Sequence, residues 1–399
     1  SRRRFQIRPV SQRASTGMAE SEGAAAALPR TAAELRRGVA DGEHYGAQLS
    51  VVHHGRRLDF CVGEASPGRS MTPDHVLCWS SSVKPVAAIA LGLLWERGLV
   101  DFEDPVAKHV PDFSAHGKAG VTIAHCLTHT AGLWGAERGA AGSQRQRLAH
   151  ICRQPLARGW VPGRRCGYDS PAWTVLGGVV AAADPSGRAY EQFVEEELFA
   201  PLGLRSSSVG MSAQRLAELR GAELLAHIYV GPRAGPREWR VAPGEDAPDS
   251  MARPCPAGNG RGPARELAGL YASLLPGSER RVLQQATVER VTRAERVGMT
   301  DELQGVDTSW SLGFAVDCIL SGRHAAPGAF GHGGSQSSWA FADPAHGLAV
   351  ACLCNGKPGP DVHYRRVGAV STAVYEDLGL AEQGAEARRF ALPAGMGTF

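Results

Sequence analysis

A serine and a lysine three positions apart, Ser81 and Lys84, stand where a serine-rich turn runs into the apolar segment 86–95. Residues three apart share one face of a helix, so the lysine amine lies close to the serine hydroxyl. A neutral amine can take the serine proton and make the hydroxyl a nucleophile, and burial and a positive helix end both favour the neutral form of an amine. The alternative is a helix capped by serines that carries one surface lysine. The pair alone does not decide between the two.

The pair needs a helix that begins at the turn, and the surrounding sequence predicts one. Serines are typical of a helix N-terminus, Pro85 is tolerated in a first helical turn, and the run that follows is apolar enough for a buried helix. Before the turn, two alternating runs at 47–52 and 57–62 flank a glycine-containing turn and predict a β-hairpin. From Trp310 onward, short apolar runs separated by turns predict further strands.

Strands near both ends of the chain therefore enclose a middle region with helical patterns. This order predicts an α/β fold, with an antiparallel sheet flanked by helices and an inserted all-α region. The stretch 231–262, rich in proline and glycine, is expected to be a long surface loop. We expect one domain at 31–385, with its α/β part at about 31–85 and 263–385 and its helical part at about 86–262. A disordered tail is expected before it, at 1–30, with Met18 as the natural start. A second tail is expected at 386–399.

Composition excludes several classes of function. With a formal charge of +3 over 399 residues, the chain has no basic stripe of the kind that nucleic acid requires, and no apolar run reaches the length of a membrane span. The nine cysteines are scattered without a Cys-x-x-Cys pair, so neither a disulfide framework nor a zinc site is predicted. We expect a cytoplasmic protein with no cofactor, no metal, and neither nucleic acid nor a membrane as a partner.

Three later stretches strengthen the signal of the serine–lysine pair. They are 121–133, which contains Leu-Thr-His-Thr, 162–177, which contains Gly-Tyr-Asp-Ser, and 330–335, which reads Phe-Gly-His-Gly-Gly-Ser. In this order and spacing they resemble the serine β-lactamase and penicillin-binding-protein superfamily, specifically the class C-like branch with its DD-peptidases, family VIII esterases and transesterases. The similarity covers roughly residues 31–380, and it implies the β-lactamase/DD-peptidase-like fold.

The resemblance implies a role for each motif. Ser81 would be the acylated nucleophile, Lys84 its proton partner, and Tyr168 the phenol that carries a proton between nucleophile, leaving group and incoming acceptor. The amides of Ser81 and Ser335 would form the oxyanion hole, since backbone donors there meet the negative oxygen of a tetrahedral intermediate. The residues implied in substrate binding are His332, Gly333, Gly334, Ser170 and Trp339.

Several of these residues also have a purely structural alternative. Tyr168 can be a phenol that covers a helix start, and His332 can be a turn residue between glycines. His125 and His129 have the i, i+4 spacing of a metal pair, but no third ligand is evident, and His129 falls in a turn that is structural in the superfamily. Considered jointly with Ser81, the catalytic interpretation of Tyr168 is the better one.

Two departures from the superfamily pattern bear on the substrate. Ser170 stands where β-lactamases and peptidases typically carry an asparagine that holds a substrate amide, and Gly333 stands where they usually carry a hydroxyl residue that helps to bind a substrate carboxylate. Both losses favour a neutral acyl donor, as in esterases and the transacylases of secondary (antibiotic) metabolism. The resemblance thus implies a serine esterase or acyltransferase that passes an acyl group from a small-molecule donor to water, an alcohol or an amine.

Three alternatives accompany this interpretation. A β-lactamase or a D-Ala-D-Ala peptidase would use the same machinery. A catalytically silent binding protein would have no use for Ser81, Lys84 and Tyr168 together. An α/β-hydrolase places its His-Gly-Gly motif before the nucleophile and requires a Gly-x-Ser-x-Gly elbow, whereas here the motif comes last and no such elbow exists.

Overall fold

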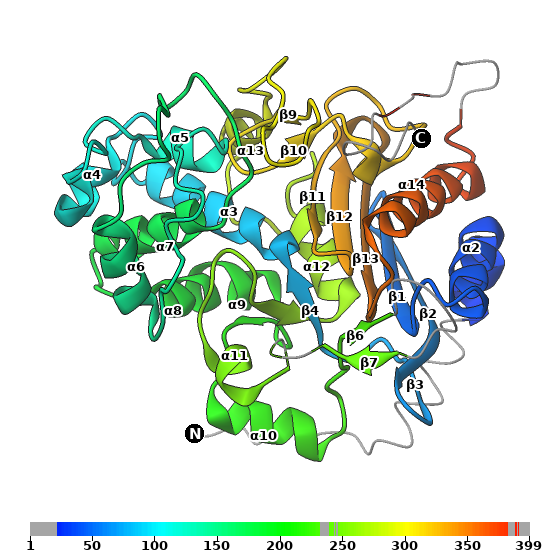
Figure 1. Cartoon of the computed structure of the whole chain (residues 1–399). Coiled ribbons are helices and arrows are strands. Elements are labelled where there is room, and N and C mark those ends of the chain that lie inside the picture. The colour runs from blue at the N-terminus through cyan, green and yellow to red at the C-terminus, as the bar shows by residue number, and fades with distance from the viewer. Residues whose placement is uncertain are drawn as a thin grey trace, which may run out of the picture.

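An eight-stranded antiparallel sheet forms the centre of the molecule (Figure 1). The structure, a computed structural model, describes residues 22–231, 239–242, 244, 246–381, 388 and 390. In order across the sheet, the strands are β3 (Arg69–Ser70), β2 (Arg56–Ser66), β1 (Gly46–His53), β13 (Leu348–Cys354), β12 (Ser338–Asp343), β11 (Phe330–Gly334), β10 (Ala315–Val316) and β9 (Ser309–Trp310). The predicted α/β fold, with a sheet drawn from sequence-distant segments, is confirmed.

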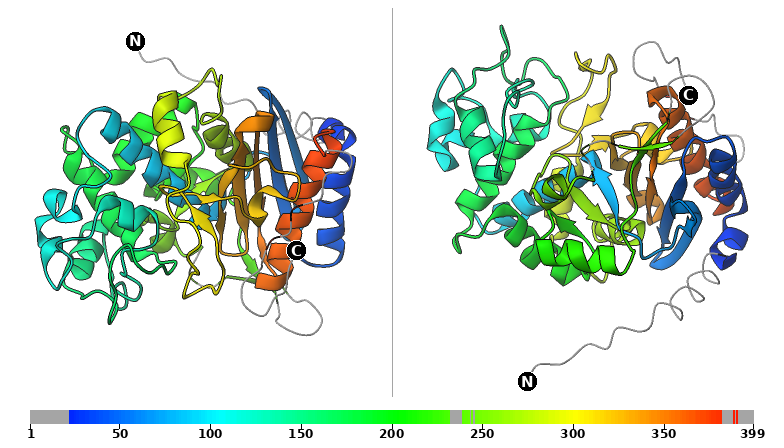
Figure 2. Two further views of the ribbon diagram at one scale, coloured as in Figure 1. Left: turned by 90° about the horizontal axis from the view of Figure 1, so that it is seen from above. Right: turned by 60° about the horizontal axis from the view of Figure 1, so that its bottom comes forward.

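The two ends of the chain meet in the middle of this sheet. β1 pairs with β13 along its length, with Ala47 opposite Cys354 and His53 opposite Leu348. Helices α2 (Pro29–Ala40) and α14 (Pro360–Asp377) pack together over one face of the sheet, and α12 (Ala264–Ala272) lies against β1, β12 and β13 on the other (Figures 1 and 2). Because both faces are covered, β13 is a continuous apolar strand in which all seven residues are buried.

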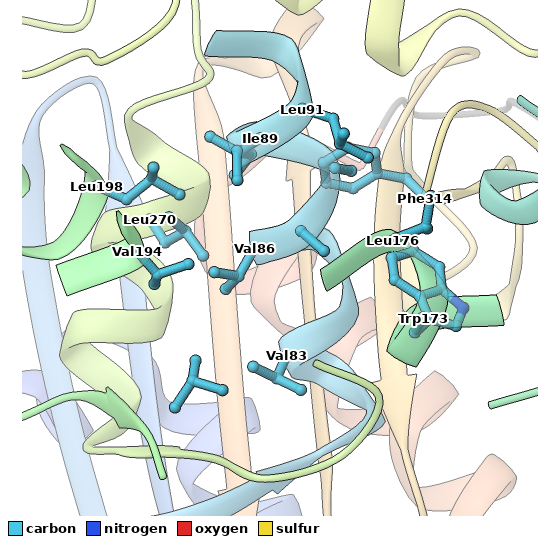
Figure 3. Packing of buried hydrophobic residues seen from close by; sticks show 14 of the residues in the cluster. Val83, Val86, Ile89, Leu91, Trp173, Leu176, Val194, Leu198, Leu270 and Phe314 are labelled. Carbon is cyan, nitrogen blue, oxygen red and sulfur yellow. The ribbon is translucent and has the colours of Figure 1, made fainter. Parts of the chain in front are cut away.

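The helical region surrounds one central helix, α3 (Lys84–Glu96). Every residue of α3 from Lys84 to Leu94 is buried, as expected for a helix that is apolar on all sides. Figure 3 shows its side chains packed among those of α7 (Pro171–Ala183), α8 (Tyr190–Val194) and α12. This packing holds the first turn of α3, and with it the serine–lysine pair, in a fixed position between the helices and the sheet.

The remaining elements are short. The other helices are α4 (Val106–His109), α5 (Ile123–Leu127), α6 (Gln144–Cys152), α9 (Ala200–Leu202), α10 (Ala213–Gly221), α11 (Pro248–Ala252) and α13 (Gln285–Thr292). Two three-stranded sheets have the orders β4 (Leu77–Ser80), β8 (Gly260–Gly262), β5 (Ser208–Val209) and β14 (Gly356–Lys357), β6 (Tyr229–Val230), β7 (Arg240–Val241). Across the described ranges, no helix combines the length and the apolar character that crossing a bilayer requires.

The disordered tail predicted over residues 1–30 is wrong for its described part. Residues 22–27 are helical, and α2 already begins at Pro29. The physical reason is burial: Ala24 and Leu28 are only 2% and 1% exposed, because they pack into the apolar layer between the helices and the sheet. The rest of that predicted tail lies outside the described residues.

The stretch 231–262, predicted as a surface loop, contains regular structure that the sequence pattern did not signal. Its last residues form β8, which pairs with β4 directly before the serine-rich turn. A Cβ on Gly260 would overlap the side chain of Val83, so a glycine is what lets β8 approach this turn. The glycine at 260 thus reflects a close approach of the β8 backbone to the side chains of Val83 and Trp79.

Candidate active site

The Ser81 hydroxyl stands at the junction between a strand and a helix. β4 ends at Ser80, whose φ of +47° is rare for a residue with a side chain, and one turn of 3₁₀ helix leads into α3. The sequence predicted that the serines cap the helix, but neither flanking serine makes a capping hydrogen bond. Instead, the Oγ of Ser80 lies 3.3 Å from that of Ser337, and the Oγ of Ser82 donates to the His332 carbonyl at 3.1 Å. These contacts hold the strained turn against β11 and the turn that follows it.

Lys84 lies one turn further along, fully buried, with its amine directed at Ser81. Its Nζ donates to Ser81 Oγ at 3.0 Å and to the Ala257 carbonyl at 2.6 Å. The same Nζ lies over the rings of Tyr168 and Trp173, 5.0 and 5.9 Å from their centroids. No carboxylate among the described residues forms an ion pair with Lys84. A lysine in this position can exchange a proton with the serine without breaking an ion pair.

Tyr168 meets Lys84 with its ring rather than with its hydroxyl. Its backbone N donates to the Asp301 carboxylate at 2.8 Å, and its ring lies 4.5 Å from that of His129. The hydroxyl has no hydrogen-bond partner among the described residues, and Tyr168 lines the cavity that Ser81 also lines. Hydrogen bonds of catalytic groups often form only when substrate binds. The role of Tyr168 as a proton carrier stays a prediction, for which this position is suitable.

Two buried histidines form the wall behind Lys84, and both are uncharged. Burial, followed by the Lys84 charge, lowers the pKa of His332 to about 3, and the same two causes hold the pKa of His129 well below 6.5. His332 Nδ1 donates to the Gly333 carbonyl at 2.7 Å, and His129 Nδ1 accepts from the backbone N of Asp169 at 3.1 Å. The wall therefore contributes aromatic surface and no further positive charge beside Lys84.

Asp169 is a buried carboxyl beneath the site. It accepts hydrogen bonds from the amides of Leu133 and Ala172, each at 3.3 Å, yet burial raises its pKa to about 7. Its contact of 4.0 Å with His129 is not an ion pair, because His129 is neutral. Folding therefore disfavours the ionised form of the Asp169 carboxyl.

We expect this carboxyl to make the protein less stable as the pH rises. An acid whose pKa is raised by folding binds its proton more tightly in the folded chain, so the folded state loses stability as the pH climbs from the unfolded value of 3.8 towards about 7. The unfolding temperature of Asp169→Asn, followed by calorimetry from about pH 4 to pH 7, should therefore fall less steeply with pH than that of the unmodified protein.

Asp184→Asn is the matched control for this measurement. A hydrogen bond from Arg188 holds the pKa of Asp184 at about 2, and the unfolded chain, with a value of 3.8, binds this proton only near pH 4. Above about pH 5, loss of Asp184 should therefore lower the unfolding temperature without changing the slope. Asparagine at 169 can accept a hydrogen bond from only one of the two amides, so the variant will have a lower unfolding temperature at every pH. The comparison is therefore between the slopes of unfolding temperature against pH and not between the temperatures themselves. An Asp169→Asn slope equal to that of the unmodified protein would show that Asp169 ionises as it does in the unfolded chain.

Ser335, the second residue predicted for the oxyanion hole, lies in the turn after β11. Its Oγ accepts a hydrogen bond from Lys357 Nζ at 3.2 Å, and its backbone φ is +27°. The preceding Gly334 lies so close to the start of the serine-rich turn that a Cβ there would stand 2.5 Å from the Trp79 carbonyl oxygen. Glycine at 334 is thus what lets β11 bring Ser335 to the rim shared with Ser81.

Two cavities open at Ser81 and Ser335, and both residues line each of them. The first has a volume of about 440 Å³, and its other lining residues include Tyr168, Trp310, Leu320, His332, Tyr364 and Phe390. The second has a volume of about 350 Å³, and its other lining residues include Glu137, Arg147, Ser170, Arg253, Asn259 and Arg261. Both cavities mix polar and apolar side chains, but their charges differ: the first is lined by two acidic residues, Asp307 and Asp317, and the second by three arginines and one glutamate.

The structure brings most of the predicted substrate-binding residues to these cavities and places one elsewhere. Those on the first cavity are His332, Gly333 and Gly334, and Ser170 lies on the second. Trp339 is fully buried on the face of β12 that packs against α14, where its Nε1 donates to Ser371 Oγ at 3.1 Å. This corrects the role predicted for Trp339: neighbouring strand residues point to opposite faces, and Trp339 points to the α14 side.

Sequence reasoning missed most of the residues that line the cavities, among them two arginines and a phenylalanine. Arg147 lies on α6, Arg253 follows α11, and Phe390 comes from the segment predicted as a second tail, yet is only 8% exposed. None of them belongs to a recognisable motif, and the chain has many other arginines with the same local context. In the described part of the chain, no cluster of three or more histidine, cysteine or acidic side chains has an arrangement that would hold a metal ion.

A serine hydroxyl that accepts a hydrogen bond from a lysine at the start of a buried helix, beside strand β11, has the arrangement found in serine hydrolases of the acyl-enzyme type. The model of the Beta-lactamase family matches residues 31–373, so the chain belongs to that family. The resemblance drawn from the motifs is confirmed.

Two relatives and one solved structure illustrate the family. The chain is 30% identical over 313 residues to the esterase/beta-lactamase LipL of Mycobacterium tuberculosis, covering 73% of this chain and 71% of LipL. It is 28% identical over 378 residues to the esterase EstB of Burkholderia gladioli, covering 79% and 88%. The crystal structure of a family VIII carboxylesterase matches with a TM-score of 0.74 at 25% identity, over 88% of this chain and 97% of that one.

Proposed function

We propose that this enzyme cleaves small-molecule esters through an acyl-Ser81 intermediate and passes the acyl group to water, an alcohol or an amine. The observation that carries the proposal is the hydrogen bond of 3.0 Å between Lys84 Nζ and Ser81 Oγ, at the point where two cavities meet. EstB is named an esterase and LipL an esterase/beta-lactamase, and the activity common to both names supports an ester as the donor.

The reaction divides into two acyl transfers. In the first, Ser81 Oγ attacks the ester carbonyl while Lys84 takes its proton, and the amides of Ser81 and Ser335 donate to the oxyanion. The carbon–oxygen bond then breaks, and Tyr168 delivers a proton to the leaving oxygen. In the second, water or another acceptor attacks the acyl-serine by the reverse proton path, which releases the acid or a new ester or amide and restores the serine hydroxyl.

A β-lactam or a D-Ala-D-Ala peptide fits this site less well than an ester. The asparagine and the hydroxyl side chain that would hold such substrates are replaced by Ser170 and Gly333. A Cβ at 333 would lie 3.2 Å from Leu320 Cδ2, so the wall of the first cavity has taken part of the space of the missing side chain. We therefore expect hydrolysis of a chromogenic cephalosporin to be slower than hydrolysis of an activated ester.

The finer parts of the proposal are the acceptor and the compartment. A cavity of about 440 Å³ has room for a small organic acceptor, which supports an alcohol or amine of secondary metabolism, as in antibiotic biosynthesis. All nine cysteines are free thiols, which supports a cytoplasmic setting.

Rapid mixing with a p-nitrophenyl ester tests the proposal. Acylation of Ser81 should release a burst of nitrophenolate equal to the enzyme concentration, followed by a slower steady state. Added alcohols or amines should raise the steady-state rate and appear as acylated products by mass spectrometry if transfer competes with hydrolysis. The absence of both a burst and turnover would overturn the proposal.

Tyr168→Phe should slow the reaction most where the leaving group needs a proton. We expect kcat for an ethyl ester to fall by about 10²-fold or more, since a positioned general acid contributes that much. The loss should be smaller for a p-nitrophenyl ester, whose leaving group departs as a stable anion. Steady-state kinetics with both esters measures the difference.

Tyr364→Phe is the control, because Tyr364 lines the same cavity and the change removes the same hydroxyl. It should affect both esters alike and only slightly. If Tyr168→Phe reduced the two rates by equal factors, Tyr168 would be a positioning residue and not the proton donor to the leaving group.

A further inference from the structure

Two half-buried arginines on the second cavity, Arg147 and Arg253, have few partners among the described residues. The Arg147 side chain is 11% exposed, its Nε is buried without a hydrogen-bond partner, and its Nη2 lies 3.7 Å from Glu137, beyond hydrogen-bond distance. The Arg253 side chain makes no hydrogen bond or ion pair with any described residue. Water can hydrate a half-buried guanidinium, and an anionic ligand that replaces this water gains charge-assisted hydrogen bonds.

The other two charged residues on this cavity neither bind an anionic ligand nor neutralise these arginines. Arg261 is buried but already engaged, at 3.1 Å from Asn259 and 3.4 Å from Asp246. The Glu137 side chain is 39% exposed, so solvent screens its charge. Arg147 and Arg253 therefore remain as two donors for an anionic group beside Ser81, and a planar guanidinium suits the geometry of a carboxylate.

The position of Tyr168 decides which part of the substrate enters which cavity. Tyr168 lines the first cavity and not the second. A proton donor must lie within hydrogen-bond reach of the leaving oxygen, so the leaving group, and later the acceptor, occupy the first cavity. The acyl chain extends from the carbonyl in the other direction, into the second cavity and towards the two arginines.

We propose that the acyl group carries a carboxylate, which Arg147 and Arg253 bind in the second cavity, so that the donors are monoesters of dicarboxylic acids. This inference rests on the proposed function, and it replaces the neutral acyl donor that the sequence predicted. That prediction was based on Ser170 and Gly333, the departures in the second and third motifs, and did not include the arginines of the second cavity. The carboxylate takes no part in bond making: the ester bond breaks, Ser81 is acylated, and the charged end remains in place.

Matched pairs of esters test the proposal. The p-nitrophenyl monoesters of adipic, pimelic and suberic acid each have a carboxylate at a different distance from the carbonyl, and the methyl ester of each is the uncharged counterpart. For at least one chain length, kcat/KM should be about 10- to 100-fold higher for the charged member, which is the size expected for charge-assisted hydrogen bonds. Raising the salt concentration should reduce this preference.

Variants locate the effect. Arg147→Gln and Arg253→Gln should each lower kcat/KM for the charged ester by about tenfold or more and leave the methyl ester nearly unchanged. Arg145→Gln is the control, because Arg145 lies on the same helix, α6, is exposed, and does not line the cavity. It should alter neither ester. Two separate arginine variants keep the test decisive if one of them folds poorly.

The outcomes separate this inference from the proposed function. Equal or better turnover of all three methyl esters would overturn the carboxylate site while ester hydrolysis stood. A preference for the charged esters that both Arg147→Gln and Arg253→Gln leave unchanged would overturn it as well. A preference that Arg145→Gln reduces as much as Arg147→Gln would also overturn it, since the effect would then be one of overall charge. No turnover of any ester would overturn the proposed function itself.

Discussion

Ser81→Ala should remove ester hydrolysis and covalent labelling together. The reaction has no acyl-enzyme without the Ser81 oxygen, so kcat/KM for a p-nitrophenyl ester should fall by at least about 10³-fold, as when the nucleophile of a serine hydrolase is deleted. Alanine removes one hydroxyl whose single strong contact is with Lys84, so folding should be preserved. Intact-mass spectrometry after treatment with a fluorophosphonate should show one adduct on the unmodified protein and none on the variant.

The neighbouring serine provides the control for this result. Ser80→Ala removes a hydroxyl from the same turn, one whose contact with Ser337 is structural. It should retain labelling and most of the activity, with lower stability. Retention of hydrolysis and labelling in Ser81→Ala, or their loss in Ser80→Ala alone, would contradict the assignment of the nucleophile.

Lys84→Met should have an effect of similar size for a different reason. Methionine fills much of the buried space of the lysine but can neither take nor return a proton, so we expect kcat to fall by about 10³-fold, within the range that general base catalysis supplies. Because the serine hydroxyl remains, slow labelling by a fluorophosphonate should persist. Single-turnover kinetics of acylation, over a range of pH, measures the step that Lys84 serves.

Lys118→Met separates the loss of a base from the loss of a buried lysine. Lys118 is also fully buried, but its Nζ donates to the carbonyls of Ala115, Cys152 and Gln154, away from the cavities. Its replacement should lower the free energy of unfolding by about 2 kcal/mol or more, since buried carbonyls lose their donor, and leave kcat nearly unchanged. If Lys84→Met lost stability in the same way and kept its activity, Lys84 would be structural.

The predictions that succeeded depend on local geometry. Ser81 and Lys84 are adjacent on a helix because of the spacing along one turn, and this relation survives although the serines do not cap the helix. The fold class followed from the positions of strand and helix patterns along the chain, since strands at both ends can only be buried if they pair, as β1 and β13 do. Helical spacing and strand or helix patterns can each be recognised from a short stretch of sequence.

The predictions that failed concern contacts between distant segments. The resemblance implied a role for Trp339 in substrate binding, but the alternation of side chains along β12 turns it to the side of α14. The early helix before Pro29 was missed because its few apolar residues are stabilised by packing against the sheet and not by a periodic pattern of their own. A single sequence gives the side chains but not the surface that each one meets.

The amino-acid sequence by itself determined the contact between Ser81 and Lys84 and the family, because a helical turn and the order of short motifs are properties of neighbouring residues. Only the tertiary structure decided which charges surround the nucleophile. The neutrality of His332 follows from burial, and the pairing of Arg147 with Arg253 on one cavity joins two helical segments about a hundred residues apart. Burial and distance between such segments are set by how the whole chain packs, so the chemistry of the substrate is read from the fold.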